Sequence, residues 1–365
     1  MNLSENVYAA LSNKPHDRIP FFADLSWYYT SLVNQGKLDK QYEGQEGMLK
    51  FHTDLGVSMC FYPPGLWKTE YTDLDITVDE SGGRRVTTYN SKIGKTRQVE
   101  EFLPSSHNWA IREHFIKTVE DLRIMTHIWE NTNHFPNYEP FTQISKLWGD
   151  FGTPVGFSYA GVSPLQRLLT RWAGVVTTYN LLADYADELE EIFLRLETAD
   201  DAIFDILAQS PAFYIEICDN LSSEITGAYN FERYNAPVYK KHNDNLHKAG
   251  KFTGIHIDGT LRGCLKLLAK CGFDAAEAVT PAPVGDIQLA DLRAEAGDIV
   301  IWGGIPGALF SPIYGEEFFK DHIDEIIRVF GKDNRFILGT ADQVPPDGLL
   351  SRVSYAAEQI NAVKL

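Results

Sequence analysis

The chain has 365 residues, 44% of them hydrophobic, and its 33 Lys and Arg against 50 Asp and Glu give a formal net charge of −17. A chain of this length and apolar content can bury a large hydrophobic core. An acidic chain without a cluster of basic residues is not expected to bind the phosphate backbone of a nucleic acid. Met1–Asn6 lacks the blocks of a secretory signal, and no apolar run reaches the roughly 18 residues of a membrane span, so we expect no membrane association and a cytoplasmic protein with reduced cysteines.

Short segments rich in apolar and β-branched residues recur along the chain, and most of them end in Gly, Pro, Asp or Asn. Such segments are predicted strands, because these end residues terminate extended structure. They are Arg18–Asp24, Val57–Tyr62, Pro154–Tyr159, Phe213–Asp219, Phe252–Asp258, Asp274–Thr280, Asp298–Gly303 and Arg335–Thr340.

Segments with the apolar periodicity of an α-helix lie between many of these predicted strands. Apolar residues recur at steps of three and four in Leu181–Leu207, in Leu261–Cys271 before Gly272, and in Phe319–Phe330 before Gly331. Strands that alternate with helices predict parallel βαβ units, and eight such strands favour closure. We therefore predict an α/β fold, a (β/α)8 TIM-type barrel that forms a single domain over residues 1–365. An open doubly wound sheet is the alternative, but no GxGxxG follows the first strand.

One segment departs from this alternation. Tyr71–Phe102 is polar and rich in β-branched residues, with Gly82 and Gly83 between two strand-like runs. The glycine pair indicates a tight turn, so we predict a β-hairpin inserted near residues 71–102. A lid over the barrel mouth and a plain surface excursion are both open interpretations.

The most informative residues lie on two neighbouring predicted strands. Because side chains alternate along a strand, His256 and Asp258 share one face, which we expect to point into the barrel. Glu277 stands alone among small apolar residues, where a carboxylate needs a partner, a proton or a cation. An imidazole and two carboxylates at one depth suit a divalent metal, zinc above others. A hydrogen-bonded His–carboxylate pair without metal is the alternative.

Other candidates follow the same logic. Glu216 has inward parity and is a further candidate ligand. The remaining residues lie at strand ends, where a substrate would bind: Asp24, Trp27, Tyr28, Asp219 and Asp342. Trp27 and Tyr28 are candidates to wall a pocket for a flat substrate, and core packing is the alternative for both. For Asp219 the alternative is a helix cap.

Several ordered motifs span nearly the whole chain: Pro15–Pro20, His256–Gly259, Gly272–Glu277, Thr280–Asp286, Trp302–Pro306 and Leu338–Asp347. Together they resemble the uroporphyrinogen decarboxylase superfamily. The resemblance implies a (β/α)8 barrel with its pocket at the carboxyl ends of the strands, in agreement with the strand pattern.

The superfamily has two main branches, and the chain departs from both. Decarboxylases hold substrate carboxylates with an arginine-rich loop after the first strand, whereas Asp24–Thr30 contains no arginine. Several cobalamin-dependent methyltransferases hold zinc through a His-x-Cys pair and a later Cys. The resemblance places His256 at the His and Asp258 at the first Cys, with Ala341 or Asp342 near the last Cys.

Oxygen ligands in place of thiolates favour an oxygen substrate over a thiol. The resemblance thus implies an O-demethylase-like enzyme, a corrinoid-dependent methyltransferase of EC class 2.1.1 with His256 and Glu277 as catalytic residues. It would move a methyl group between a small methoxylated, aromatic substrate and cobalamin carried by a partner corrinoid protein, with zinc held by His256, Asp258, Glu277 and Glu216. Transfer from methylcobalamin to a thiol or tetrahydrofolate, a decarboxylase of uroporphyrinogen type and a purely binding barrel are alternatives. The oligomeric state, including a homodimer, is open.

Overall fold

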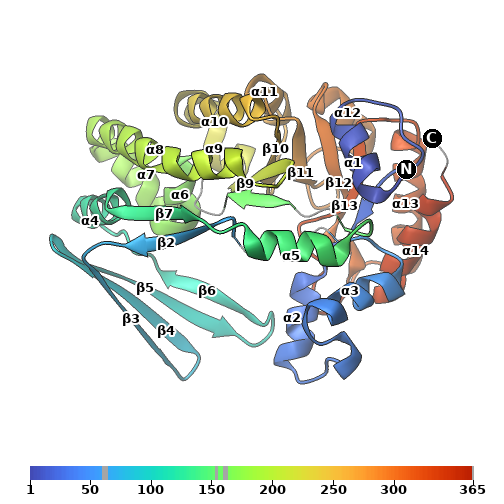
Figure 1. Ribbon diagram of the computed structural model, residues 1–365, viewed down its shortest axis with the longest axis horizontal. Coiled ribbons are helices and arrows are strands. Elements are labelled where there is room, and N and C mark those ends of the chain that lie inside the picture. Colours follow the sequence, from blue (N-terminus) through green and yellow to red (C-terminus); the bar gives the residue numbers. More distant parts are fainter. Residues whose placement is uncertain (60–64, 153–154, 159–162, 364–365) are drawn as a thin grey trace.

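A curled parallel sheet forms the centre of the protein in a computed structural model that describes residues 1–59, 65–152, 155–158 and 163–363. Its strands run in the order β1-β13-β12-β11-β10-β9-β8, and every neighbouring pair is parallel (Figure 1). The bounds are β1 Phe21–Phe22, β8 Gly156–Ser158, β9 Tyr214–Leu221, β10 Phe252–Ile257, β11 Ala275–Val279, β12 Val300–Pro306 and β13 Phe336–Ala341. Seven of the predicted strands are thereby confirmed, although β1 and β8 are short.

The remaining predicted strand, Val57–Tyr62, is only partly described. Ser58 forms an isolated parallel bridge with Phe22 of β1, which places this segment next to β1 as a barrel requires. Residues 60–62 lie outside the described residues. Among the described residues no pairing joins this segment to β8, so closure of the ring stays a prediction.

Aromatic side chains inside the sheet show how strongly it curls. The ring of Trp302 on β12 lies 5.1 Å from Phe22 on β1 and 5.6 Å from Tyr214 on β9, centroid to centroid. In a flat sheet, β12 and β9 would be separated by three strand spacings, roughly 14 Å. The three rings therefore fill an interior, which helix α1 (Leu3–Leu11) covers at the amino ends of the strands.

Helices surround the outer face of the sheet. They are α2 Ser26–Asn34, α3 Gly44–Leu55, α5 Glu139–Trp148, α6 Pro164–Arg167, α7 Gly174–Asp184, α8 Ala186–Gln209, α9 Ser223–Asn230, α10 Ala236–Lys248, α11 Leu265–Lys270, α12 Leu289–Ala296, α13 Glu316–Phe330 and α14 Leu350–Asn361, with short η1 Lys40–Tyr42 and η4 Gly307–Phe310. Two π-turns, η2 Leu168–Trp172 and η3 Phe231–Asn235, follow α6 and α9. The predicted helix over Leu181–Leu207 is two helices, because the chain leaves helical geometry at Tyr185 (φ −137°).

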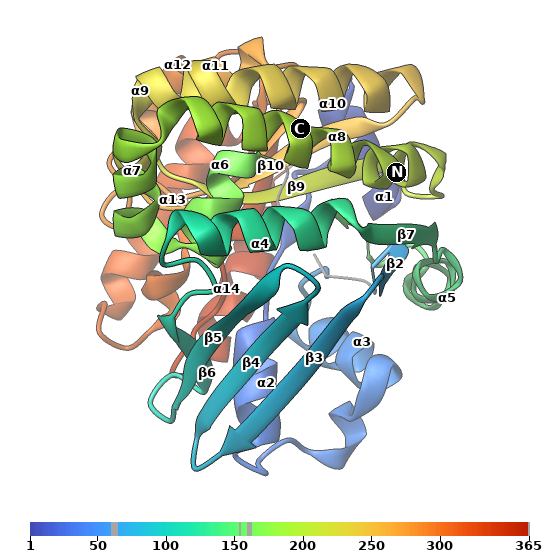
Figure 2. The same cartoon turned by 90° about the vertical axis from the view of Figure 1, so that its left-hand side faces the viewer.

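The insertion is larger than the predicted hairpin. Four antiparallel strands form a meander, β3 Leu74–Ser81, β4 Arg84–Ser91, β5 Gly94–Leu103 and β6 Asn108–Glu113 (Figure 2). The turn at Gly82 and Gly83 is confirmed, with φ of +58° and +77°. The second pair was missed because β5 and β6 carry charged residues on both faces, which hides the alternation that marks a strand.

A second pairing and a buried ion pair attach the insertion. β2 Trp67–Tyr71 pairs with β7 Thr132–Pro136 at its base, and α4 Val119–Glu130 lies between. Trp129 of α4 donates to Asp200 of α8 at 2.8 Å, and Arg167 of α6 pairs with the same carboxylate at 2.6 Å. Both ends of the ion pair are fully buried, so the arrangement holds α4 firmly against the helical layer.

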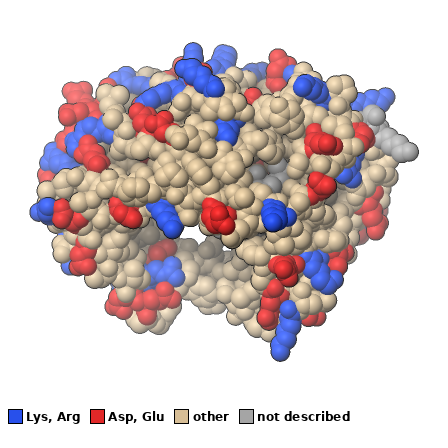
Figure 3. Space-filling model, in the orientation of Figure 1, with Lys and Arg blue, Asp and Glu red and all other residues tan. Residues whose placement is uncertain are grey.

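Two surface properties complete the description. Within the described residues, no helix combines the length and the apolar character that crossing a membrane requires. On the face shown in Figure 3, Lys and Arg are interspersed with Asp and Glu, and no basic patch gathers.

Trp302→Ala tests the packed interior. The side chain is 1% exposed, and its removal should lower the free energy of unfolding by about 3–5 kcal/mol, since a large aromatic leaves a cavity that its neighbours refill only in part. Urea unfolding followed by circular dichroism measures the change. Val176→Ala is the control, because Val176 is 74% exposed and should cost less than about 0.5 kcal/mol. Equal losses in the two variants would contradict the packing described above.

Candidate metal and active site

Side chains from β9, β10 and β11 converge inside the sheet near the carboxyl ends of the strands. His256 and Glu277 are register partners on β10 and β11, while Gly254, two residues before His256, pairs with Glu216 on β9. The side chains of Glu216, His256 and Glu277 are 1%, 7% and 7% exposed. Ile255 and Ile257 belong to the core under the helices, as their parity predicts.

His256 lies between two carboxylates. Its Nδ1 is 2.5 Å from Oε2 of Glu277, and its Nε2 is 3.6 Å from Oδ1 of Asp258. Burial by itself lowers the pKa of His256, but the Glu277 and Asp258 carboxylates outweigh it and raise this pKa well above the usual 6.5. Both carboxylates thus favour the charged form of the imidazole over the neutral form.

Glu216 occupies the deepest position of the group. The Tyr214 hydroxyl donates to Oε2 of Glu216 at 3.2 Å. Burial, and then the nearby charge of Glu277, raises the pKa of Glu216 well above 4.5. One ligand atom each from Glu216, His256 and Glu277 lies within 4.8 Å of the others, so these three residues form what we call the inner cluster.

Asp342 completes a second group closer to solvent. It follows β13 with a φ of +68°, an unusual value for a residue other than glycine. One ligand atom each from His256, Asp258 and Asp342 lies within 4.8 Å of the others, and we call this group the outer cluster. Burial, and then the charge of Asp258, raises the pKa of Asp342 to about 6. The two clusters share His256.

Asp24 lies beside these clusters at the end of β1. Its carboxylate accepts from the Ser26 amide at 2.8 Å and from Nε2 of Gln343 at 3.2 Å. Burial raises the pKa of Asp24, and the charge of Glu277 adds to that rise. The predicted substrate residue Asp24 is therefore close enough to the inner cluster to interact electrostatically with it.

The structure places the other predicted substrate residues elsewhere. Trp27 donates from Nε1 to the backbone oxygen of Ser106, 2.7 Å away, in the loop between β5 and β6 of the insertion. Tyr28 stacks on Phe51 of α3, with 6.4 Å between ring centroids. Asp219 accepts from the Tyr239 hydroxyl of α10 at 2.6 Å, so its carboxylate faces the helical layer and is not brought together with His256.

A β-bulge in β11 changes one expectation. The register with β12 shifts between Ala276 and Val279, and Ala278 has a φ of +60°. Val279 therefore packs in the core under the helices, whereas strict alternation along the strand would place it on the inward face with Glu277. Bulges re-aim side chains next to active sites, and here the strand turns directly after Glu277.

Two residues that affect the site, Tyr214 and Arg171, were not predicted from the sequence. Tyr214 is hydrogen-bonded to Glu216, and their spacing of two residues on one strand is a signal that parity would have revealed. Arg171 on the π-turn η2 is the second, since its charge lowers the pKa of Cys218 against a larger rise caused by burial. No sequence pattern marks Arg171, because its position depends on how η2 packs over β9.

Comparison with known proteins adds evidence on the fold. No family model matches the chain, and no curated protein matches it in sequence. In three dimensions the chain is similar to a methyltransferase from Methanosarcina mazei, with 14% sequence identity over 99% of this chain and 100% of that one, at a TM-score of 0.61. The similarity extends over both chains and shows a shared fold.

Glu216→Gln tests the electrostatics of the inner cluster. In metal-free protein at pH 8 the variant should be more stable than the unmodified chain, because an acid whose folded pKa is raised loses stability as the pH rises above its unfolded pKa of about 4.5. Near pH 4 the two proteins should be equally stable. Urea unfolding with a chelator at both pH values measures the difference. If the unfolding free energy of the variant, relative to that of the unmodified chain, is lower at pH 8 than at pH 4, the raised pKa of Glu216 is contradicted.

Proposed function

We propose that the protein is an enzyme that transfers a methyl group between a methoxylated aromatic substrate and a corrinoid protein. The observation that carries this proposal is the placement of His256, with Glu277 on Nδ1 and Asp258 facing Nε2, at the carboxyl ends of the strands. Such a group suits a metal ion that activates an oxygen atom.

The outer cluster fits a zinc ion better than the inner one. Zinc binds nitrogen and oxygen ligands at about 2.0–2.2 Å, so two ligands of a tetrahedral ion lie about 3.3 Å apart. The separation of 3.6 Å between His256 Nε2 and Asp258 Oδ1 is close to this value. The contact of 2.5 Å between His256 and Glu277 is a hydrogen bond that leaves no room for an ion.

His256, Asp258 and Asp342 would thus hold the ion, and it would supply Lewis acidity to the ether oxygen. In this arrangement Glu277 acts on His256 and not on the ion. Its carboxylate accepts the Nδ1 proton, which fixes the ring and would turn Nε2 toward the ion that His256 and Asp258 share. Glu216 stays protonated below, in keeping with its raised pKa. The proposal thereby gives Glu277 and Glu216 supporting roles where the sequence suggested direct ligation.

The charges around the site favour a neutral substrate. Asp258 and Asp342 lie beside His256, Asp24 lies near enough to Asp342 and Glu277 to raise the pKa of Asp342, and the loop Asp24–Thr30 has no arginine. A polycarboxylate would be repelled there, which disfavours decarboxylation of the uroporphyrinogen type. A methoxyarene carries no charge until its carbon–oxygen bond breaks and the electron pair stays on the oxygen.

The proposed methyl acceptor follows from the resemblance of the sequence motifs. Cobalamin carried by a partner protein would supply the nucleophile, as the resemblance of the sequence motifs implies. The shared fold with a protein described as a methyltransferase supports methyl transfer in general. Transfer in the opposite direction, to a thiol or tetrahydrofolate, would use the same site, and an assay can separate the two.

Metal content tests the outer cluster. Purified protein dialysed against zinc should hold one ion per chain by elemental analysis, and Asp342→Asn should lower its affinity at least tenfold because it removes a charged ligand. Glu216→Gln is the matched control and should bind zinc normally. Loss of zinc in Glu216→Gln with retention in Asp342→Asn would move the ion to the inner cluster.

Activity tests the reaction itself. With methoxyarenes and a reduced corrinoid protein, the zinc-loaded enzyme should form methylcobalamin, measured by its absorbance. Glu277→Gln should reduce kcat by about 10²-fold, since outer partners of a metal-bound histidine contribute at this level. Absence of methylcobalamin with every donor, while zinc is bound, would sink the proposal. Product formation with tetrahydrofolate or a thiol as acceptor would favour the opposite direction.

A further inference from the structure

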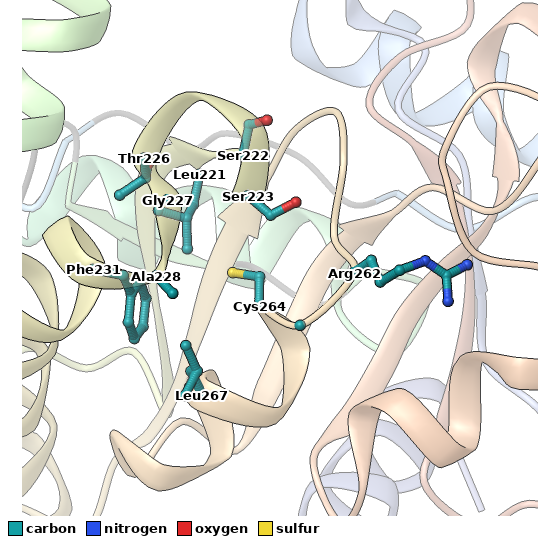
Figure 4. A pocket seen from close by; sticks show the side chains of 11 residues that line it. Leu221, Ser222, Ser223, Thr226, Gly227, Ala228, Phe231, Arg262, Cys264 and Leu267 are labelled. Carbon is teal, nitrogen blue, oxygen red and sulfur yellow. The ribbon is translucent and has the colours of Figure 1, made fainter.

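A pocket on the outer side of the curled sheet lies between α9 and α11. Its volume is about 110 Å³, and Leu221 forms its inner end (Figure 4). The remaining lining residues come from α9 and its continuation and from the chain that follows β10: Ser222, Ser223, Thr226, Gly227, Ala228, Phe231, Arg262, Gly263, Cys264 and Leu267. Leu221 and Cys264 belong to the core under the helices, so the pocket is separate from the inward-facing His256.

The walls of this pocket are apolar where they face its interior. In Figure 4 the Cys264 thiol points toward Leu221 and Ala228, whereas the Arg262 side chain extends away. Burial raises the pKa of Cys264 to about 12, so the thiol stays neutral and acts as a soft apolar surface. A ligand in this pocket would contact the hydrocarbon side chains of Leu221 and Ala228 and the sulfur atom of Cys264.

The polar side chains on the walls already have partners. Thr226 donates to Gln166 at 3.3 Å, and Arg262 donates to the Asp286 backbone at 2.7 Å. The Ser222 and Ser223 hydroxyls are both bonded to Thr260, at 3.2 and 3.1 Å. A polar ligand would therefore have to break existing hydrogen bonds, whereas an apolar ligand would not.

The backbone of α9 beside the pocket is irregular, and it leaves open space next to Gly227. Helix α9 is interrupted at Gly227, whose φ of +70° and ψ of +154° are not helical, and the π-turn η3 follows it. A Cβ atom at Gly227 would meet no atom within 4 Å. Irregular helices of this kind often occur at functional sites.

The pocket also adjoins the loop that carries Asp258. Thr260 in this loop accepts from the Ser223 amide at 2.7 Å and from the Glu224 amide at 3.1 Å, which ties the loop to the start of α9. On the other side, the Leu261 amide donates to Asp286 at 2.7 Å. A molecule wedged between α9 and Cys264 would press on this short loop and restrict its motion.

We propose that this pocket is a second binding site, for a compact apolar molecule or apolar group such as a benzene ring or a branched alkyl chain, and that its occupancy stiffens the Asp258 loop. At about 110 Å³ the pocket is smaller than the closed apolar cavity of about 150 Å³ that takes up benzene, and its open side leaves room for part of a ring to project. The site does not depend on the proposed reaction, and it can be tested without any turnover.

Fluorobenzene is the probe for binding to the full-length protein, followed by fluorine NMR. We expect saturable binding in the millimolar range, weakened at least tenfold by Ala228→Trp, because Ala228 is a wall residue at the surface where an indole can fill the pocket. Leu194→Trp is the matched control, since Leu194 on α8 is 66% exposed and lies outside the pocket. Binding that Ala228→Trp leaves unchanged overturns the site.

Alkylation of the unmodified protein gives an independent readout if the variant does not fold. Iodoacetamide labelling at pH 9, resolved by peptide mass spectrometry, should slow about tenfold at Cys264 when fluorobenzene is at ten times its dissociation constant. Cys271 is the internal control, because it is buried to a similar degree but does not line the pocket. Equal labelling of Cys264 with and without the probe contradicts the proposal.

Hydrogen exchange tests the coupling to the loop. The amides of Asp258 and Leu261 are both hydrogen-bonded, and their exchange should slow when fluorobenzene is bound. Amides of α13, which do not contact the pocket, should be unaffected. Protection of Cys264 without slower exchange at Leu261 would retain the site and overturn the coupling.

Discussion

Charge buried inside a curled sheet is the constraint on which the site depends. An imidazole or a carboxylate in this interior is unstable alone, and the solution here is mutual pairing of His256 with Glu277 at 2.5 Å. The pair is possible because the strands curl, so that β9, β10 and β11 present their inward side chains to one small volume. Below it, rings of Phe22, Tyr214 and Trp302 fill the space that water would otherwise occupy. The sheet thus supplies both the low polarity that strengthens the interaction and the geometry that satisfies it.

The strand pattern could be predicted from sequence because buried parallel strands are short apolar runs between turn residues. The alternation on β10 correctly separated His256 from Ile255 and Ile257. What alternation cannot show is a bulge, and at Ala278 the count of residues no longer matches the pairing. The insertion exposed the same limit in another way, since β5 and β6 carry charged residues on both faces, which hides the apolar alternation that marks a strand.

Residues at the ends of the predicted strands were harder to assign than residues within them. Asp219 and Asp342 both follow an apolar run, and nothing local distinguishes them. The structure sends the Asp219 carboxylate to Tyr239 of α10 and brings Asp342 beside His256 and Asp258. The difference arises from the long-range packing of α10 and from the positive φ at Asp342. Neither feature can be predicted from a single sequence. Side chains at strand ends therefore depend on tertiary packing, whereas the alternation along β10 was enough to place His256 on the inward face.

The hydrogen bond between Trp27 and Ser106 has a consequence for how molecules reach the interior. The insertion is fastened at its root by the β2–β7 pair and by the hydrogen bond from Trp129 of α4 to Asp200, and at its far end by the bond to α2. A segment fixed at both ends forms a rigid frame and not a hinged flap. A molecule that approaches the carboxyl ends of the strands past the insertion then meets a fixed outline, and its passage requires no movement of the insertion as a whole.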